Sequence, residues 1–118
     1  MTTLTLPYPP SVNTLYATVH GRRVLSKAGR EYHKAVAESV AKQGIASFGD
    51  ARVGYSVTAF MPDKRRRDLS NLCKILEDSL TYAGVWDDDS QVDRFTWERG
   101  HVTTGGSLFI EIEKLEME

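Results

Sequence analysis

Apolar and polar residues alternate along four short stretches of the chain, and this period of two is typical of strands with one buried face. The stretches cover residues 3–9, 52–61, 94–100 and 107–116. Prolines close the first stretch, which places that strand at the edge of a sheet, because proline cannot donate a hydrogen bond to a neighbouring strand. The pattern therefore predicts a sheet of about four strands.

Two further segments repeat their apolar residues every three to four positions, which is the period of an amphipathic helix. The first covers residues 26–44, with Ser26 as a candidate N-cap and Gly44 as a candidate C-cap. The second covers residues 68–83 and is followed by Gly84. Two helices packed on a mixed sheet give a small α/β fold. Asn13, in a proline-rich connection, is expected to cap or bridge a turn.

The second helix has one apolar and one polar side. Its apolar stripe consists of Leu69, Leu72, Cys73, Leu76, Leu80 and Ala83. Cys73 is therefore expected to be a small core residue. The polar side consists of Asn71, Lys74 and Asp78, with Asp68 at its edge. Trp86 and Trp97 are expected in the core or at an interface, rather than as platforms that stack on bases.

The size and composition of the chain fit one cytosolic domain. Its 118 residues are 41% hydrophobic and 26% charged, which is ordinary for a globular protein. No signal segment opens the sequence, and no apolar run reaches the roughly 20 residues of a membrane helix. A single cysteine excludes a disulfide framework and a cysteine zinc site. The three histidines have no ligand spacing, so each is expected at the surface or satisfied by neighbours.

Charge is divided unevenly along the chain. Residues 1–67 contain 11 Lys and Arg against 4 Asp and Glu, whereas residues 68–118 contain 4 against 12. One interpretation is a basic surface for nucleic acid beside an acidic cluster. The other is that both are solvated faces that cancel.

The strongest charges lie at the two ends of the second helix. The basic loop, Lys64–Arg67, runs into Asp68 at the helix start, where unpaired N–H groups favour a phosphate. Asp68 itself has two roles open to it: to cap the helix or to bind a metal ion. The acidic turn, Asp87–Asp89, follows the helix. In an extended segment at most two of its three side chains face one site.

A hard cation such as Mg²⁺ accepts oxygen ligands and needs few carboxylates. If the acidic turn comes back near Asp68, the result is an acidic pocket beside a basic loop, an arrangement suited to phosphodiester hydrolysis. Lys74 could then neutralise charge on the scissile phosphate. Its alternative is an ion pair with Asp78, four residues further on. Gly21–Arg23, the "GRR" of an expected hairpin or loop, could extend a DNA track together with Lys27 and Arg30, or form a solvated loop.

The stretch "MPDKRRRDLSNLCKILEDSL", followed by "AGVWDDDSQV", resembles the RusA family of Holliday-junction resolvases, as does "LPYPPSVN" near the start. The resemblance implies a homodimeric, Mg²⁺-dependent endonuclease that nicks four-way DNA junctions symmetrically, with Mn²⁺ as a substitute ion. It also implies metal-binding carboxylates at Asp68 and Asp89 with Asp88 adjoining, a functional lysine at Lys74, and a DNA-contacting asparagine at Asn71.

One position departs from the family pattern: Ser70 stands where an aspartate is usual. A hydroxyl is a poorer Mg²⁺ ligand than a carboxylate, so Ser70 is expected to contribute through water. Two other functions therefore stay open. One is a junction-binding protein with weak or no cleavage, and the other is a plain protein-interaction domain.

Overall fold

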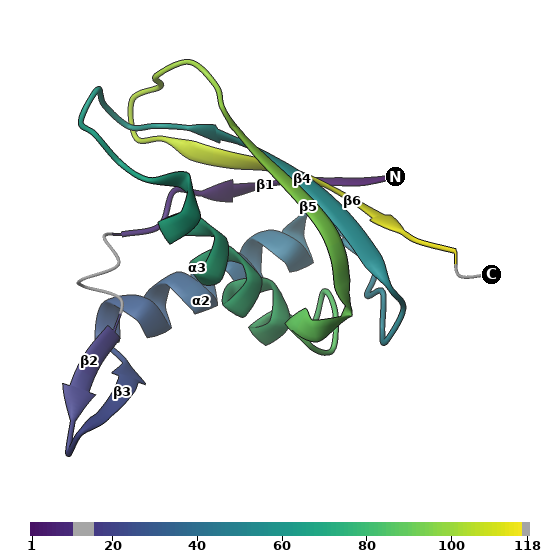
Figure 1. Ribbon diagram of the computed structural model, residues 1–118, viewed down its shortest axis with the longest axis horizontal. Coiled ribbons are helices and arrows are strands. Elements are labelled where there is room, and N and C mark those ends of the chain that lie inside the picture. Colours follow the sequence, from purple (N-terminus) through teal and green to yellow (C-terminus); the bar gives the residue numbers. More distant parts are fainter. Residues whose placement is uncertain (11–15, 117–118) are drawn as a thin grey trace.

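The computed structural model describes residues 1–10 and 16–116, and Asn13 lies outside the described residues. Its main sheet has four strands in the order β1 (Thr2–Pro7), β6 (Ser107–Lys114), β4 (Val53–Phe60) and β5 (Val92–Arg99). β4 and β5 run parallel, and the other pairs are antiparallel. The predicted mixed sheet is confirmed, with its first strand at one edge and β5 at the other (Figure 1).

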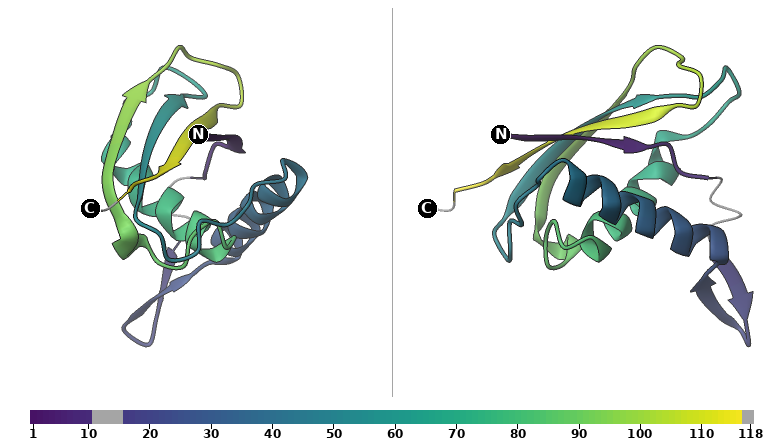
Figure 2. Two further views of the ribbon diagram at one scale, coloured as in Figure 1. Left: turned by 90° about the vertical axis from the view of Figure 1, so that its right-hand side faces the viewer. Right: turned by 180° about the vertical axis from the view of Figure 1, so that it is seen from behind.

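Both helices, α2 (Lys27–Lys42) and α3 (Leu69–Tyr82), lie on one face of this sheet (Figures 1 and 2). The core forms between the layers, where Val36 and Leu76 meet Val57 and Ile110 of the central strands. The predicted cap of the first helix is confirmed, because Ser26 Oγ accepts a hydrogen bond from Gly29 N at 3.1 Å. The other face of the sheet carries no helix among the described residues.

The buried stripe of α3 differs from the predicted one at its margin. Leu72, Leu76 and Leu80 are buried as expected, and so are Ile75 and Ser79, which the pattern left out. Cys73 is only half-buried, so its assignment to the core is wrong. The stripe is rotated toward Ile75 because α3 packs against both α2 and the sheet, and Cys73 lies at its margin, with its Sγ 3.4 Å from the Tyr55 hydroxyl of β4.

Of the hairpin and the loop expected around Gly21–Arg23, the structure shows the hairpin, a second, two-stranded sheet of β2 (Tyr16–Val19) and β3 (Arg22–Leu25). It projects from the body beside the start of α2 (Figure 1). Its two-residue turn has His20 at φ 51° and Gly21 at φ 74°. Positive φ at both positions matches the twist of a tight hairpin.

The β4–α3–β5 unit decides where the charged segments lie. Because β4 and β5 are parallel, with Val53 opposite Val92 and Ala59 opposite Arg99, the chain must cross back over the sheet between them. α3 makes this crossing, and its 14 residues span about 21 Å. The loop before α3 and the turn after it therefore lie at opposite ends of the unit.

Candidate active site

The basic loop is organised by a residue that the sequence analysis did not single out, Asp63. Its carboxylate pairs with the Arg67 guanidinium through two hydrogen bonds, one of them at 3.1 Å, and accepts from Arg65 N at 2.9 Å. These contacts, led by the one to Arg67, lower the pKa of Asp63 to about 2. Arg99 of β5 donates to the carbonyl oxygen of Arg67 and ties the loop to the sheet. Lys64 and Arg66 stay exposed and available to a polyanion.

Asp68 occupies the N-cap position of α3 with extended backbone, but its side chain makes no capping hydrogen bond. The capping role is therefore not used, and the exposed carboxylate faces a pocket of about 610 Å³. The pocket is lined by Tyr8, Pro9, Pro10, Pro62, Arg66, Arg67, Asp68, Asn71, Leu72 and Ile75. Four of the predicted site residues, Arg66 to Asp68 and Asn71, thus meet at one concave surface. Ser70 is exposed on the first turn of α3 and does not line it.

The acidic turn is held rigidly by a buried residue, Gln91. Its Oε1 accepts from Asp87 N at 3.1 Å and Asp88 N at 3.0 Å, while its Nε2 donates to Gly49 O and Ala51 O. The Asp88 carboxylate caps the short helix η1 (Asp89–Gln91) by accepting from Ser90 N at 2.9 Å. This contact with Ser90 lowers the pKa of Asp88, with a smaller contribution from Lys74.

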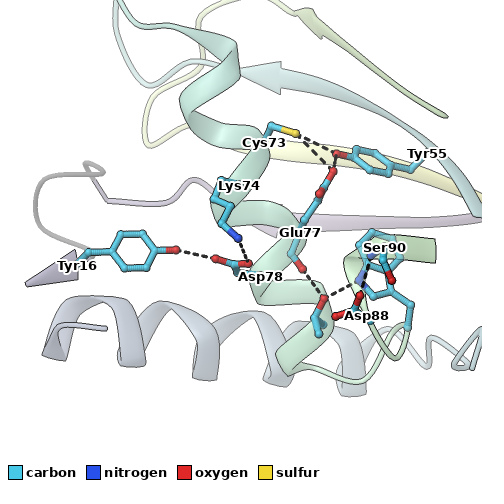
Figure 3. A network of polar contacts seen from close by, with 10 residues as sticks. Tyr16, Tyr55, Cys73, Lys74, Glu77, Asp78, Asp88 and Ser90 are labelled. Atoms are coloured by element: carbon cyan, nitrogen blue, oxygen red, sulfur yellow. Dashed lines mark hydrogen bonds and ion pairs between the residues drawn. The ribbon is translucent and has the colours of Figure 1, made fainter. Parts of the chain in front are cut away.

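Lys74 forms the ion pair with Asp78 that was its alternative role, at an Nζ–Oδ1 distance of 3.0 Å (Figure 3). The second oxygen of Asp78 accepts from the Tyr16 hydroxyl at 2.8 Å, so the projecting hairpin holds the partner of Lys74. Asp78 raises the pKa of Lys74, and Asp89 adds a smaller increase. Lys74 is therefore paired mainly with Asp78 of its own helix, and Asp89 of the acidic turn acts on it more weakly.

The expected pocket that encloses Asp68 together with Asp88 and Asp89 does not form within one chain. Asp68 follows β4 at one end of α3, whereas Asp88 and Asp89 precede β5 at the other. Within residues 1–10 and 16–116, no three carboxylates, histidines or cysteines gather closely enough to hold a metal ion. One chain thus offers an uncommitted carboxylate at Asp68 and a separate pair at Asp88 and Asp89. Mg²⁺ accepts one or two carboxylates with water and phosphate, so either group fits such an ion, but not all three together.

The remaining predicted DNA contacts lie beside the hairpin. Lys27 and Arg30 are both exposed at the start of α2. Lys27 Nζ lies 4.0 Å from Glu31 Oε1, and Arg30 donates to Leu25 O at 3.0 Å. The Arg23 guanidinium lies 4.4 Å from the centre of the Tyr16 ring. Trp86 is buried and donates to Thr81 at 2.7 Å, which confirms its place in the core.

Comparison with known proteins decides the family. The model of a family described as endodeoxyribonuclease RusA matches residues 7–113 of the chain. The chain belongs to the RusA family. It is 40% identical over 111 residues to the crossover junction endodeoxyribonuclease of Enterobacteria phage HK97, a match that covers 94% of the chain and 92% of the relative. The RusA proteins of Escherichia coli K12 and of Enterobacteria phage 82 are each 41% identical over 113 residues, or 95% of the chain and 93% of the relative.

The resemblance inferred from the motifs is thereby confirmed. These relatives are named as nucleases, which hydrolyse phosphodiester bonds. In the part of the chain that the structure describes, no helix is long and apolar enough to cross a membrane.

Proposed function

We propose that this RusA-family chain is an endonuclease that cleaves four-way DNA junctions by paired, symmetric nicks during recombination and repair. The observation that carries the proposal is the match to the family model over residues 7–113, together with relatives named for cleavage at crossover junctions. The exposed basic residues around the Asp68 pocket support it, because a nuclease needs cationic contacts to phosphate beside its reactive groups.

Each described group has a task that its position allows. Lys64 and Arg66 contact the DNA backbone from the loop, and Asn71 contacts DNA from the wall of the pocket. Asp63 keeps Arg67 and Arg65 in place. Lys74, held charged by Asp78, stabilises negative charge on phosphate near the acidic turn. A Mg²⁺ or Mn²⁺ ion bound by Asp68, or by Asp88 and Asp89, would supply a Lewis acid and an activated water.

The proposal includes a homodimer that acts in the cytoplasm of a bacterium or of a phage-infected cell. Symmetric cleavage of a four-way junction requires two equivalent sites, which a two-fold dimer provides with one interface. The relatives come from enterobacteria and their phages, where such DNA is accessible in the cytoplasm.

The proposal is tested with purified protein, a labelled synthetic junction and Mg²⁺ or Mn²⁺. We expect paired nicks with wild-type protein and a loss of at least about 10²-fold with Asp68→Asn or Asp89→Asn. Lys34→Gln serves as a control, since Lys34 is exposed on α2 outside the pocket and the acidic turn, and it should cleave normally. Absence of nicks under either metal, or cleavage by both aspartate variants at the wild-type rate, would contradict the proposal.

A second function is favoured by Ser70, which is exposed and uncharged where the family usually carries a carboxylate. In this alternative the chain binds junctions tightly and cleaves them weakly or not at all. Ser70→Asp adds an oxygen ligand close to Asp68 and should then raise the cleavage rate without changing junction affinity. An unchanged or lower rate in Ser70→Asp would exclude this alternative.

A further inference from the structure

The projecting hairpin is tied to α3 through the hydroxyl group of Tyr16, the first residue of β2. This hydroxyl donates a hydrogen bond to Asp78 Oδ2 at 2.8 Å, although the two residues lie 62 positions apart in the sequence. The Tyr16 ring packs against the hydrophobic core, and the Arg23 guanidinium lies over it, 4.4 Å from the ring centre. These contacts hold the ring so that its hydroxyl points from the hairpin to the surface of α3 (Figure 3).

The contact between Tyr16 and Asp78 has a fixed direction. Burial, and then the hydrogen bond to Asp78, raise the pKa of Tyr16 to about 12, so its hydroxyl stays protonated at neutral pH. An ionised carboxylate can only accept hydrogen bonds. Tyr16 is therefore always the donor and Asp78 the acceptor.

The Asp78 carboxylate is shared between the hairpin and Lys74. One oxygen accepts from Tyr16, and the other lies 3.0 Å from Lys74 Nζ (Figure 3). The Asp78 side chain is 27% exposed, whereas that of Lys74 is 69% exposed. A rotation of the carboxylate would break one of its two contacts, so Tyr16 fixes the orientation in which Asp78 meets Lys74.

The helix by itself would hold this ion pair only weakly. Lys74 precedes Asp78 by four residues, and a cation on the N-terminal side of its acidic partner is the less favourable order at this spacing. In an exposed pair, the entropy lost in ordering two side chains offsets most of the attraction. Lysine has a flexible stem of four carbons, so an unsupported Lys74 would sample many positions. A contact from outside α3 is needed to fix the pair, and Tyr16 supplies it.

The Lys74 ammonium group also acts on the acidic turn. Asp78 is the main cause of the raised pKa of Lys74, and Asp89 adds to the rise. Hydrogen bonds from Ser90 lower the pKa of Asp88, and Lys74 adds to this effect. The position of Lys74 therefore decides how much positive charge reaches the two carboxylates.

We propose that Tyr16 is a positioning residue for Lys74: acting through Asp78, it fixes the ammonium group beside the acidic turn. The use of this arrangement in cleavage rests on the proposed function, in which Lys74 stabilises negative charge on phosphate. A charge that is already in place does so better than a mobile one, because it needs no reorganisation during the reaction. The positioning itself does not rest on cleavage.

NMR relaxation of the lysine side chains tests the positioning in the absence of DNA and metal. Tyr16→Phe removes the hydroxyl but keeps the ring and its contact with Arg23. In the wild type, the end of the Lys74 side chain should be clearly more ordered than that of Lys34, which is exposed on α2. In Tyr16→Phe, its order parameter should fall to that of Lys34.

Tyr82→Phe is the matched control. Tyr82 is exposed at the end of α3, and its hydroxyl makes no hydrogen bond to another residue in the described part of the chain, so Lys74 should stay ordered in this variant. Two results would overturn the proposal. One is a Lys74 side chain as mobile as Lys34 in the wild type, and the other is equal order of Lys74 in the wild type and Tyr16→Phe.

A kinetic cycle tests whether the positioning serves cleavage. At saturating protein, Tyr16→Phe should lower the single-turnover cleavage rate about fivefold and leave the junction dissociation constant unchanged. In a Lys74→Gln background, Tyr16→Phe should lower the rate no further, because its effect passes through Lys74. Independent losses in the double variant, or a loss of junction affinity in place of rate, would contradict this route. A Lys74 that is ordered in the wild type and mobile in Tyr16→Phe, in a protein that never cleaves junctions, would refute only the proposed function.

Discussion

Mixing two inactive chains tests whether Asp68 and Asp89 act together across two copies. Within one chain the two carboxylates lie at opposite ends of α3, whose 14 residues span about 21 Å. This distance is several times the ligand distance of any metal ion, which is about 2 Å for Mg²⁺. Asp68→Asn and Asp89→Asn chains are each expected to lose at least about 10²-fold in cleavage rate.

The mixture is expected to recover activity. In the proposed homodimer, a site that combines the two groups takes Asp68 from one chain and Asp89 from the other, because one chain holds them at opposite ends of α3. A heterodimer then contains one site with both substitutions and one site with both aspartates. With random exchange at equal amounts, half of the dimers are mixed, so about a quarter of all sites are intact. The product should be single nicks, because only one site of each mixed dimer is active.

The assay follows a junction labelled on two opposing strands, after brief incubation of the mixed chains to allow exchange. Asp68→Asn chains mixed with chains that carry both substitutions provide the control, since that mixture contains no intact site. A mixture no more active than its two components would refute cooperation of the two aspartates across the dimer.

Three further results are expected from the contacts around the site. Asp78→Asn removes the negative charge that pairs with Lys74, so the pKa of Lys74 should fall toward its ordinary value. NMR titration of the Lys74 ammonium group measures this change. An unchanged pKa would contradict the ion pair. The pKa of Asp63 is lowered from 3.8 to about 2, so its charged carboxylate stabilises the fold above about pH 4 and loses this contribution as the pH falls to about 2. Asp63→Asn should therefore flatten the fall in melting temperature between these pH values. An unaltered slope would contradict this role of Asp63. Gln91→Met removes four hydrogen bonds to backbone groups, two in the acidic turn and two at Gly49 and Ala51. It should lower the free energy of unfolding, measured by urea denaturation, by about 3 kcal/mol. A loss below about 1 kcal/mol would show that the turn does not depend on Gln91.

The sequence predicted most of the fold because its elements have clear periods and caps. Ser26 caps the first helix as expected, and Leu72, Leu76 and Leu80 are buried. Cys73 was predicted to be buried at the edge of the apolar stripe of α3, but it is only half-buried. A helical period gives the width of an apolar face, but it does not show which neighbouring elements cover the edges of that face. The sheet order also lay beyond the pattern, because it depends on contacts between strands far apart in the chain.

The site was harder to predict for a topological reason. The basic loop and the acidic turn flank one helix, α3. Because they are close in sequence, the sequence analysis predicted one pocket shared by Asp68 and the acidic turn. The parallel pairing of β4 and β5 instead places Asp68 and Asp89 at opposite ends. Gln91 could have been suspected from its position three residues after Asp88, the spacing of a capping box. Asp63 could have been suspected from its spacing of four residues before Arg67.

The most direct measurement compares wild-type cleavage of a synthetic four-way junction with that of a linear duplex of the same sequence, at equal protein and Mg²⁺ concentrations. We expect nicks at symmetric positions in two opposing strands of the junction, and an intact duplex. Equal cutting of both substrates, or an intact junction at saturating protein, would contradict the assignment of junction-selective cleavage to this chain.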